Sequence, residues 1–126
     1  MGMGKKILIA DDSPTIVEIT KAMLKGEGYE ITTAGNGAEA LKKISEEKPD
    51  VVLLDVMMPD MDGYSALQTL RRDAKPGDDD YVHVIVITSK DQMRDLFELQ
   101  GVDGFLVKPF FRDELLDKLN EVFEAS

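Results

Sequence analysis

Apolar residues along the chain fall into two patterns. Four short runs are almost continuously apolar, at residues 5–10, 51–55, 83–88 and 105–108, and such runs are typical of strands buried on both faces. Residues 29–34 alternate apolar and polar side chains instead, which is typical of an edge strand. Between the runs, apolar residues recur every three or four positions, which predicts amphipathic helices. Strand and helix therefore alternate five times, and this order predicts an α/β domain whose parallel sheet carries helices on both faces.

Local signals mark the ends of the predicted helices. Ser13 and Pro14 suit the N-cap and first turn of the first helix, and Gly26 and Gly28 suit its end. Asp62 suits the N-cap of the third helix. The other helices are predicted at residues 38–47, 91–100 and 112–124. The residues expected to face inward from the second, third and last helices are Ala40, Leu41, Ile44, Ala66, Leu67, Leu70, Leu115, Leu116, Leu119, Val122 and Phe123.

The length, cysteine content and net charge of the chain exclude several classes of function. The chain has 126 residues, enough for one core, and no apolar run approaches the roughly 20 residues that span a bilayer. It has no cysteine, which excludes disulfides and thiolate metal sites. With 15 basic and 25 acidic residues its formal charge is −10, so direct nucleic-acid binding is not expected. We expect a single cytoplasmic domain over residues 1–126, in which the doubled Met-Gly of residues 1–4 is typical of a cloning remnant.

Polar residues stand where the predicted strands end. Asp11 and Asp12 follow the first strand, Asp55 closes the third, Thr88 closes the fourth and Lys108 closes the fifth. The carboxyl ends of parallel strands lie along one edge of a sheet, which is where open α/β sheets bind their ligands. The sequence therefore predicts that these five residues meet in one crevice.

Three carboxylates, a hydroxyl and a lysine in one crevice suggest phosphoryl chemistry. Neighbouring carboxylates repel one another, and a hard divalent cation held by oxygen ligands, Mg²⁺ above all, would compensate. A carboxylate beside Mg²⁺ can attack a phosphoryl group and form an aspartyl phosphate, with Asp55 as the nucleophile. Mg²⁺, Lys108 and Thr88 would then each face one phosphoryl oxygen.

Each of these residues alone also has a plain structural explanation. Asp11 and Asp12 could cap the following helix, and Asp55 could form a turn. Thr88 could be an ordinary strand residue, and Lys108 a solvated one. The joint pattern favours a site, because the residues stand at the ends of separate predicted strands.

The motifs together resemble the receiver domain of two-component response regulators, over essentially the whole chain. The matching segments are Asp11-Asp12, Asp55 with Met58-Pro59 and Asp62-Gly63, Thr88-Ser89, and Lys108-Pro109-Phe110. The resemblance implies a flavodoxin-like, doubly wound, five-stranded parallel sheet in the order 2-1-3-4-5, with five helices. The alternating second strand, expected at an edge, agrees with that order independently.

The resemblance also implies how the site works. Asp55 would be the phosphoacceptor, and a sensor histidine kinase or a histidine phosphotransfer protein would be the donor. Asp11, Asp12, Asp55 and the backbone carbonyl of Met57 would hold Mg²⁺ or Mn²⁺. The domain would be a signalling switch that takes up and loses its own phosphoryl group, and not an enzyme that turns over a substrate.

The same resemblance implies how the phosphorylated state would be read. Thr88 and Lys108 would bind phosphoryl oxygens, and Phe105 would occupy the aromatic switch position, which moves inward as Thr88 shifts. Because Phe105 lacks the hydroxyl of the commoner tyrosine, its switch would work by packing alone. Phe97, Phe105 and Phe111 could form a surface for a downstream target or output domain, or Phe97 and Phe111 could be plain core. A homodimer formed on phosphorylation is a further option.

Two departures from the family pattern concern the fourth strand and the segment after it. His83 stands where the family often has proline. We expect it to be a strand-edge residue and not a phosphodonor or a ligand. The segment from Thr88 to Lys108 is somewhat short, so the fourth helix would begin late or be abbreviated.

Other function classes fit the sequence less well. Phosphatases with an aspartate nucleophile usually carry Asp-x-Asp after the first strand, whereas Asp11 and Asp12 are adjacent. A flavin or nucleotide binder would need a glycine-rich phosphate loop at the first strand–helix turn. A receiver-like module that is never phosphorylated would usually lack some of the five strand-end residues. A stand-alone receiver and a piece of a longer regulator both remain open.

Met57, two residues after Asp55, leads to a prediction about the lifetime of the phosphate. A methionine offers no polar group to orient an attacking water, so we expect slow loss of the phosphoryl group. Met57→Asn should shorten the lifetime of the phosphorylated protein, as followed by intact mass after the phosphodonor is removed. An unchanged lifetime in this variant would refute the shielding role.

Overall fold

The fold is a parallel sheet of five strands, seen in a computed structural model that describes residues 4–55, 63–74, 77–79, 81–89 and 101–125. The strands are β1 (Lys6–Ala10), β2 (Glu30–Ala34), β3 (Val51–Asp55), β4 (His83–Thr88) and β5 (Gly104–Val107). Their order is β2-β1-β3-β4-β5 and every neighbouring pair is parallel, as predicted. The alternating strand β2 lies at an edge, and all five residues of β3, the four apolar residues and the closing Asp55, are buried.

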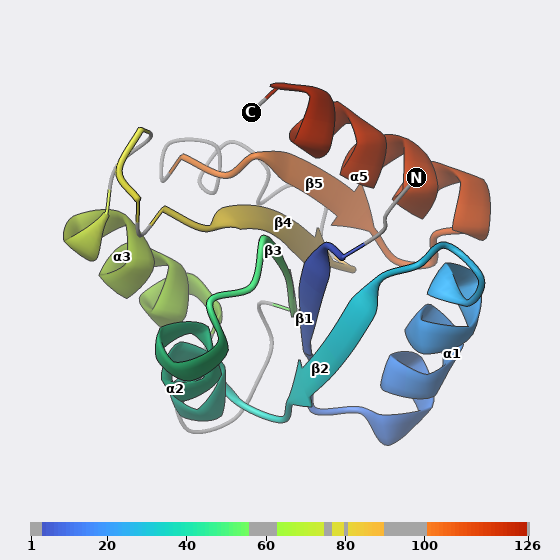
Figure 1. Cartoon of the computed structure of the whole chain (residues 1–126). Coiled ribbons are helices and arrows are strands. Elements are labelled where there is room, and N and C mark those ends of the chain that lie inside the picture. The colour runs from blue at the N-terminus through green and yellow to red at the C-terminus, as the bar shows by residue number, and fades with distance from the viewer. Residues whose placement is uncertain (1–3, 56–62, 75–76, 80, 90–100, 126) are drawn as a thin grey trace.

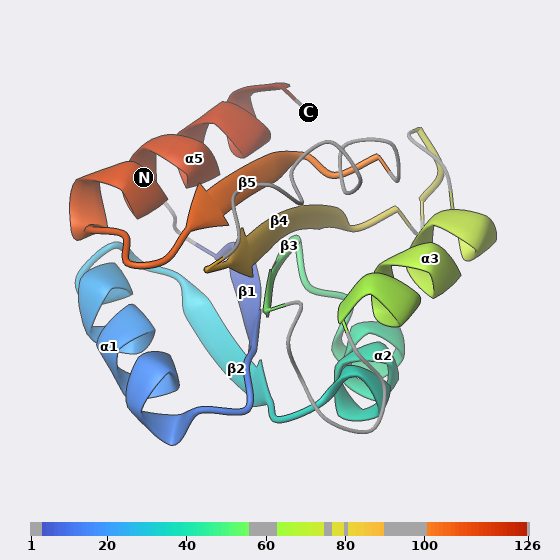
Figure 2. The same ribbon diagram turned by 180° about the vertical axis from the view of Figure 1, so that it is seen from behind.

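Helices cover both faces of the sheet. The helices α1 (Pro14–Leu24) and α5 (Arg112–Ala125) lie on one face, and α2 (Gly37–Glu47) and α3 (Gly63–Asp73) lie on the other (Figures 1 and 2). The helix predicted at residues 91–100 falls outside the described residues. None of the helices in the described part of the chain is long and apolar enough to cross a membrane.

Two apolar clusters fill the space between the sheet and its helices. Successive strand residues point to opposite faces, so the central strands contribute to both clusters in alternation. The cluster toward α2 and α3 includes Leu8, Val52, Leu54, Leu67, Val84, Val86 and Phe105. The cluster toward α1 and α5 includes Ile7, Ile9, Leu53, Ile85, Leu106, Leu115 and Leu119.

The helix ends follow the local signals in the sequence, with one shift. The Ser13 side chain accepts a hydrogen bond from the Ile16 amide at 3.3 Å, and α1 begins at Pro14. Asn36 caps α2 by accepting from the Glu39 amide at 2.8 Å, so this helix begins at Gly37, one residue earlier than predicted. The reason is that Asn36 belongs to the helix as its N-cap and not to a separate turn.

Two large apolar side chains in the described part of the chain are exposed. Ile19 is 47% exposed on α1, although it continues the helical spacing of that helix, and Phe111 is 71% exposed just before α5. Phe111 is therefore not a core residue. Phe97 lies outside the described residues.

Phe111 occupies the N-cap position of α5, which leads to a stability prediction. Its carbonyl accepts from the Leu115 amide at 3.1 Å, and its own amide donates to Glu114 Oε1 at 3.1 Å. N-cap positions favour Ser, Thr, Asp and Asn, so Phe111→Ser should raise the free energy of unfolding by about 0.5–1 kcal/mol in urea denaturation. Phe111→Ala should change it by less than about 0.5 kcal/mol, because the side chain is exposed. A loss of several kcal/mol in either variant would show that Phe111 is buried in solution.

Candidate functional site

Three carboxylates meet at the carboxyl edge of the sheet. Asp11 and Asp12 follow β1 and Asp55 ends β3, and one oxygen from each lies within 4.8 Å of the others. The two strands are hydrogen-bonded neighbours whose register pairs Ala10 with Leu54, so their ends coincide. Asp11 and Asp55 are buried, whereas Asp12 is exposed. The structure thus brings these three predicted residues together.

The ammonium of Lys108 faces the two buried carboxylates. Its Nζ lies 3.2 Å from Asp11 Oδ2 and 3.4 Å from Asp55 Oδ2. One positive charge is thus shared by two carboxylates that would otherwise repel each other in a poorly solvated place. This contact connects the end of β5 with the ends of β1 and β3.

Asp11 combines a local role with a role in the cluster. Its Oδ1 accepts a hydrogen bond from the Ser13 amide at 2.9 Å, while its Oδ2 faces Lys108. The N-cap itself is Ser13. One carboxylate oxygen of Asp11 therefore helps to organise the start of α1, as its structural explanation predicts. The other oxygen points into the carboxylate cluster.

Thr88 and Phe105 lie on the same face of the sheet near this edge. Phe105 pairs with Val86 in the β4–β5 register, and Thr88 is two residues further along β4. Both are buried, at 1% exposure for Thr88 and 6% for Phe105. The Thr88 carbonyl also accepts from the Lys108 amide at 2.8 Å, which joins the ends of β4 and β5. Met57 falls outside the described residues.

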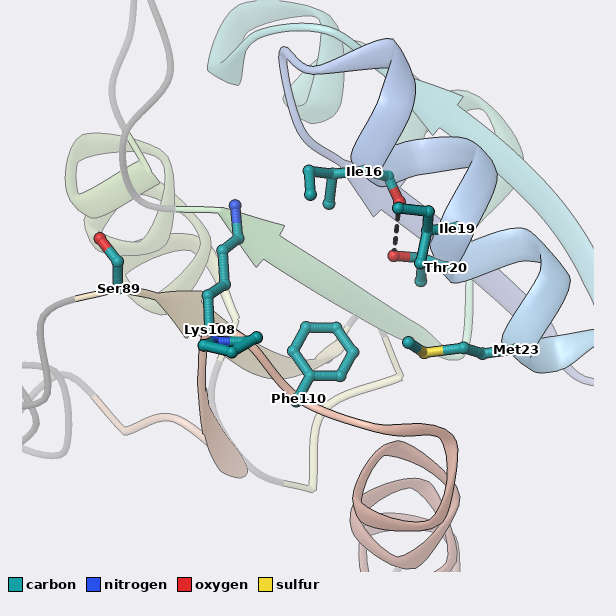
Figure 3. Close-up of a pocket in the computed structure, with 8 residues that line it drawn as sticks. Ile16, Ile19, Thr20, Met23, Ser89, Lys108 and Phe110 are labelled. Atoms are coloured by element: carbon teal, nitrogen blue, oxygen red, sulfur yellow. Dashed lines mark hydrogen bonds between the residues drawn. The ribbon is translucent and has the colours of Figure 1, made fainter.

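An apolar groove of about 430 Å³ opens beside the carboxylate cluster (Figure 3). Its lining residues are Ile16, Ile19, Thr20 and Met23 from α1 and Ser89, Lys108, Pro109 and Phe110 from the segments after β4 and β5. Lys108 is common to the groove and to the cluster. Nothing in the sequence distinguishes a rim residue such as Ile19 from a core residue, because both follow the same helical spacing, so the groove could not be predicted.

A second polar cluster lies at the opposite end of β4, centred on Asp103. The Asp103 carboxylate accepts hydrogen bonds from the Arg71 guanidinium (3.1 Å), the Tyr81 hydroxyl (3.1 Å) and the Val84 amide (2.9 Å). His83 Nδ1 lies 3.2 Å from Asp103 Oδ1, although not in hydrogen-bonding alignment. His83 is therefore a strand-start residue remote from Asp55, as the plain reading predicted.

The Asp103 cluster ties three chain segments together. Arg71, near the end of α3, also donates to the carbonyls of Gly101 at 2.8 Å and Val82 at 3.0 Å. Burial raises the pKa of Tyr81, as Asp103 also does, while Arg71 acts to lower it. The hydroxyl, which is protonated at neutral pH even at its ordinary pKa, donates its hydrogen to Asp103. The sequence did not predict this cluster, because its members are distant from one another along the chain and each belongs to a residue type that is common on protein surfaces.

The chain is similar to proteins of one family. A family model described as response regulator receiver domain matches residues 7–120, which include every member of the carboxylate cluster. PilH of Pseudomonas aeruginosa is 39% identical over 119 residues, covering 93% of this chain and 96% of PilH. TcrX of Mycobacterium tuberculosis, a probable transcriptional regulatory protein, is 38% identical over 99% of this chain, which spans only 52% of TcrX. The response regulator TrrA of Thermotoga maritima, solved in complex with Mg²⁺-BeF, has a TM-score of 0.83 and 37% identity, covering 94% of this chain and 98% of that chain.

Proposed function

The chain belongs to the response regulator receiver domains, which act as phosphoacceptors in two-component signalling, and on that premise we propose that it takes the phosphoryl group on Asp55. The observation that carries the proposal is the position of this buried carboxylate beside two further carboxylates and the Lys108 ammonium.

The same cluster supports divalent cation binding. Asp11, Asp12 and Asp55 offer oxygen ligands only, which suits Mg²⁺ or Mn²⁺, and the similar structure of TrrA holds Mg²⁺-BeF. We propose these three carboxylates as ligands, together with the backbone carbonyl of Met57. A bound Mg²⁺ would supply charge that offsets the repulsion between the carboxylates and an incoming phosphoryl group.

The transfer step that we propose uses the side chains at the carboxyl edge of the sheet. An Asp55 oxygen forms a bond to phosphorus while the bond from phosphorus to the donor's histidine nitrogen breaks, and that nitrogen keeps the electron pair. Lys108 then neutralises one phosphoryl oxygen, and the Thr88 hydroxyl donates to another. Because Thr88 and Phe105 share one face of the sheet, a shift of Thr88 toward the phosphoryl group makes room for Phe105 to follow.

A small phosphodonor tests the proposed function without a protein partner. Incubation with acetyl phosphate and Mg²⁺ should add one phosphoryl group to the intact mass, and EDTA or Asp55→Asn should prevent the gain. No gain in the parent protein would contradict the proposal. Sustained turnover of a phosphoester substrate would instead favour an aspartate-nucleophile phosphatase.

The apolar groove supports a histidine-bearing protein as the natural donor. Such a donor must bring its phosphohistidine to Asp55, so its surface must rest on the same edge of the domain. The exposed Ile19 and the buried Phe110 offer apolar contact area beside Lys108, which faces Asp55. We therefore place the kinase or phosphotransfer protein on this groove.

Ile19→Ser should lower kcat/KM for transfer from a histidine phosphotransfer protein about tenfold, because it removes an exposed apolar side chain from the lining of the groove. Acetyl phosphate, which needs no docking surface, should react at the parent rate. Ala22→Ser, also exposed on α1 but outside the groove, is the matched control and should behave as the parent does. If Ile19→Ser lowered the rate of phosphorylation equally with both donors, or did not lower it with the protein donor, the groove would not be the docking site.

A further inference from the structure

The apolar groove runs between two segments of the chain that are distant in sequence. One wall is α1, on which Ile16, Thr20 and Met23 follow at spacings of four and three residues and so form a stripe about 10 Å long (Figure 3). The other wall is the segment after β5, which includes Lys108 and Phe110. A protein that rests on this groove touches both walls, so its fit depends on the distance at which they are held.

A polar contact joins the two walls at the end of the groove nearest the phosphorylation site. The Lys108 ammonium lies 3.2 Å from Asp11 Oδ2, and Asp11 Oδ1 accepts a hydrogen bond from the amide of Ser13, the N-cap of α1. The contact therefore fixes the start of α1 relative to the end of β5. It also belongs to the proposed chemistry, because Lys108 is the residue that would turn to a phosphoryl oxygen.

Arg112, the first residue of α5, joins the two walls at the other end of the groove. Its Nε donates to the Met23 carbonyl at 2.9 Å, and its Nη2 donates to Glu27 Oε2 at 2.5 Å. Met23 lines the groove, and Glu27 follows α1. One guanidinium thus binds two acceptors at the carboxyl end of α1, which a planar fork of donors can do and a single ammonium cannot do in the same geometry.

Between these two contacts the walls meet through apolar side chains. The Thr20 hydroxyl donates to the Ile16 carbonyl of its own helix at 2.8 Å and so does not tie α1 to the opposite wall (Figure 3). Apolar contact is non-directional and tolerates small shifts, whereas charge-assisted hydrogen bonds fix both distance and direction. The spacing of the walls therefore depends on the contacts of Lys108 and Arg112.

We propose that Arg112 is a positioning residue for the protein phosphodonor, because it holds the far end of the groove at the width that the donor recognises. The inference rests on the proposed function, which places the donor on this groove. When Lys108 turns from Asp11 to a phosphoryl oxygen, the contact at the near end is released. The contacts of Arg112 involve no group of the carboxylate cluster, so they keep the far end in place during the transfer. Arg112 thus acts on the binding of the donor and not on the chemical step.

Arg112→Met removes both hydrogen bonds and keeps an unbranched side chain. The donor is a phosphorylated histidine phosphotransfer protein, selected for transfer to the parent chain. With it the variant should show a KM about fivefold higher and a kcat within about twofold of the parent value. The rate with acetyl phosphate should be that of the parent. Arg72→Met makes the same substitution at an exposed position on α3, across the sheet from the groove, and should change none of these quantities (Figure 1).

A second measurement separates positioning from a purely structural role. In an Ile19→Ser background, which already lacks an apolar contact of the groove, Arg112→Met should raise KM by less than about twofold, because the two residues act on one surface. The Arg112 side chain is 48% exposed, so its loss should lower the melting temperature by less than about 4 °C.

Several results would overturn the role of Arg112. These are a parent KM in Arg112→Met, an equal loss of rate with acetyl phosphate, an undiminished effect in the Ile19→Ser background, and a larger fall in melting temperature. Failure of the proposed function looks different. The parent chain would then gain no mass with acetyl phosphate, whereas failure of this inference alone leaves that gain intact.

Discussion

Lys108→Ala should lower the free energy of unfolding by about 2–3 kcal/mol in Mg²⁺-free buffer at pH 7, and yet bind Mg²⁺ on the order of tenfold more tightly. The two effects have one cause. The Lys108 ammonium lies 3.2 Å and 3.4 Å from the carboxylates of Asp11 and Asp55, whose side chains are only 5% and 7% exposed. Without it, two buried negative charges lose a shared compensating charge, and a divalent cation meets less repulsion.

Urea denaturation in EDTA and in excess Mg²⁺, with calorimetric titration of Mg²⁺, measures both effects. Added Mg²⁺ should recover more stability in Lys108→Ala than in the parent protein, since the cation replaces the lost charge. Lys42→Ala removes the same charge from an exposed position on α2 and should alter neither quantity. A variant of Lys108 that keeps parent stability in EDTA and parent affinity for Mg²⁺ would contradict the described cluster.

Asp103→Ala should lower the free energy of unfolding by about 2–4 kcal/mol while leaving phosphorylation by acetyl phosphate intact. Its carboxylate accepts from Arg71, Tyr81 and the Val84 amide, and Arg71 itself is only 12% exposed. Removal of the carboxylate leaves a poorly solvated guanidinium and two other donors without this acceptor. The loss is remote from Asp55, so the chemistry of the phosphorylation site should persist.

Asp103→Asn is the matched variant for this prediction. It keeps one oxygen acceptor and removes the charge, so we expect about half of the stability loss. Urea denaturation gives the free energies, and the mass gain with acetyl phosphate gives the activity. Parent stability in Asp103→Ala would show that the cluster contributes nothing to the fold. A lost mass gain in a folded variant would show that it acts on the site.

The architecture could be predicted because each strand carries its own signal. Residues 51–55 are apolar until the closing aspartate, and such a run is stable only with both faces covered, which fixes β3 near the centre of the sheet. The alternation in residues 29–34 gave the edge strand β2 in the same way. The convergence of Asp11, Asp12, Asp55 and Lys108 then followed from the geometry of parallel strands, because their ends must share an edge.

Features that depend on packing between distant segments could not be predicted. Ile16 and Ile19 follow the same helical spacing, yet Ile19 is exposed. Its exposure depends on the groove between α1 and the segment after β5, which includes Phe110, and helical spacing carries no information about that packing. Asp103 gains its partners from α3 and from the start of β4, which no local pattern connects. Phe111 appeared equally suited to core and surface, because the residue before a helix has no periodicity that tells its direction.

The central claim is that Asp55 itself carries the phosphoryl group, and borohydride reduction tests it most directly. Borohydride reduces an acyl phosphate to the alcohol, so an aspartate that was phosphorylated is converted to homoserine. After treatment with acetyl phosphate and Mg²⁺, peptide mass spectrometry should find homoserine at position 55 and at neither Asp11 nor Asp12. Homoserine at another aspartate, or phosphate held on Thr88, Ser89 or His83 with Asp55 intact, would contradict the account.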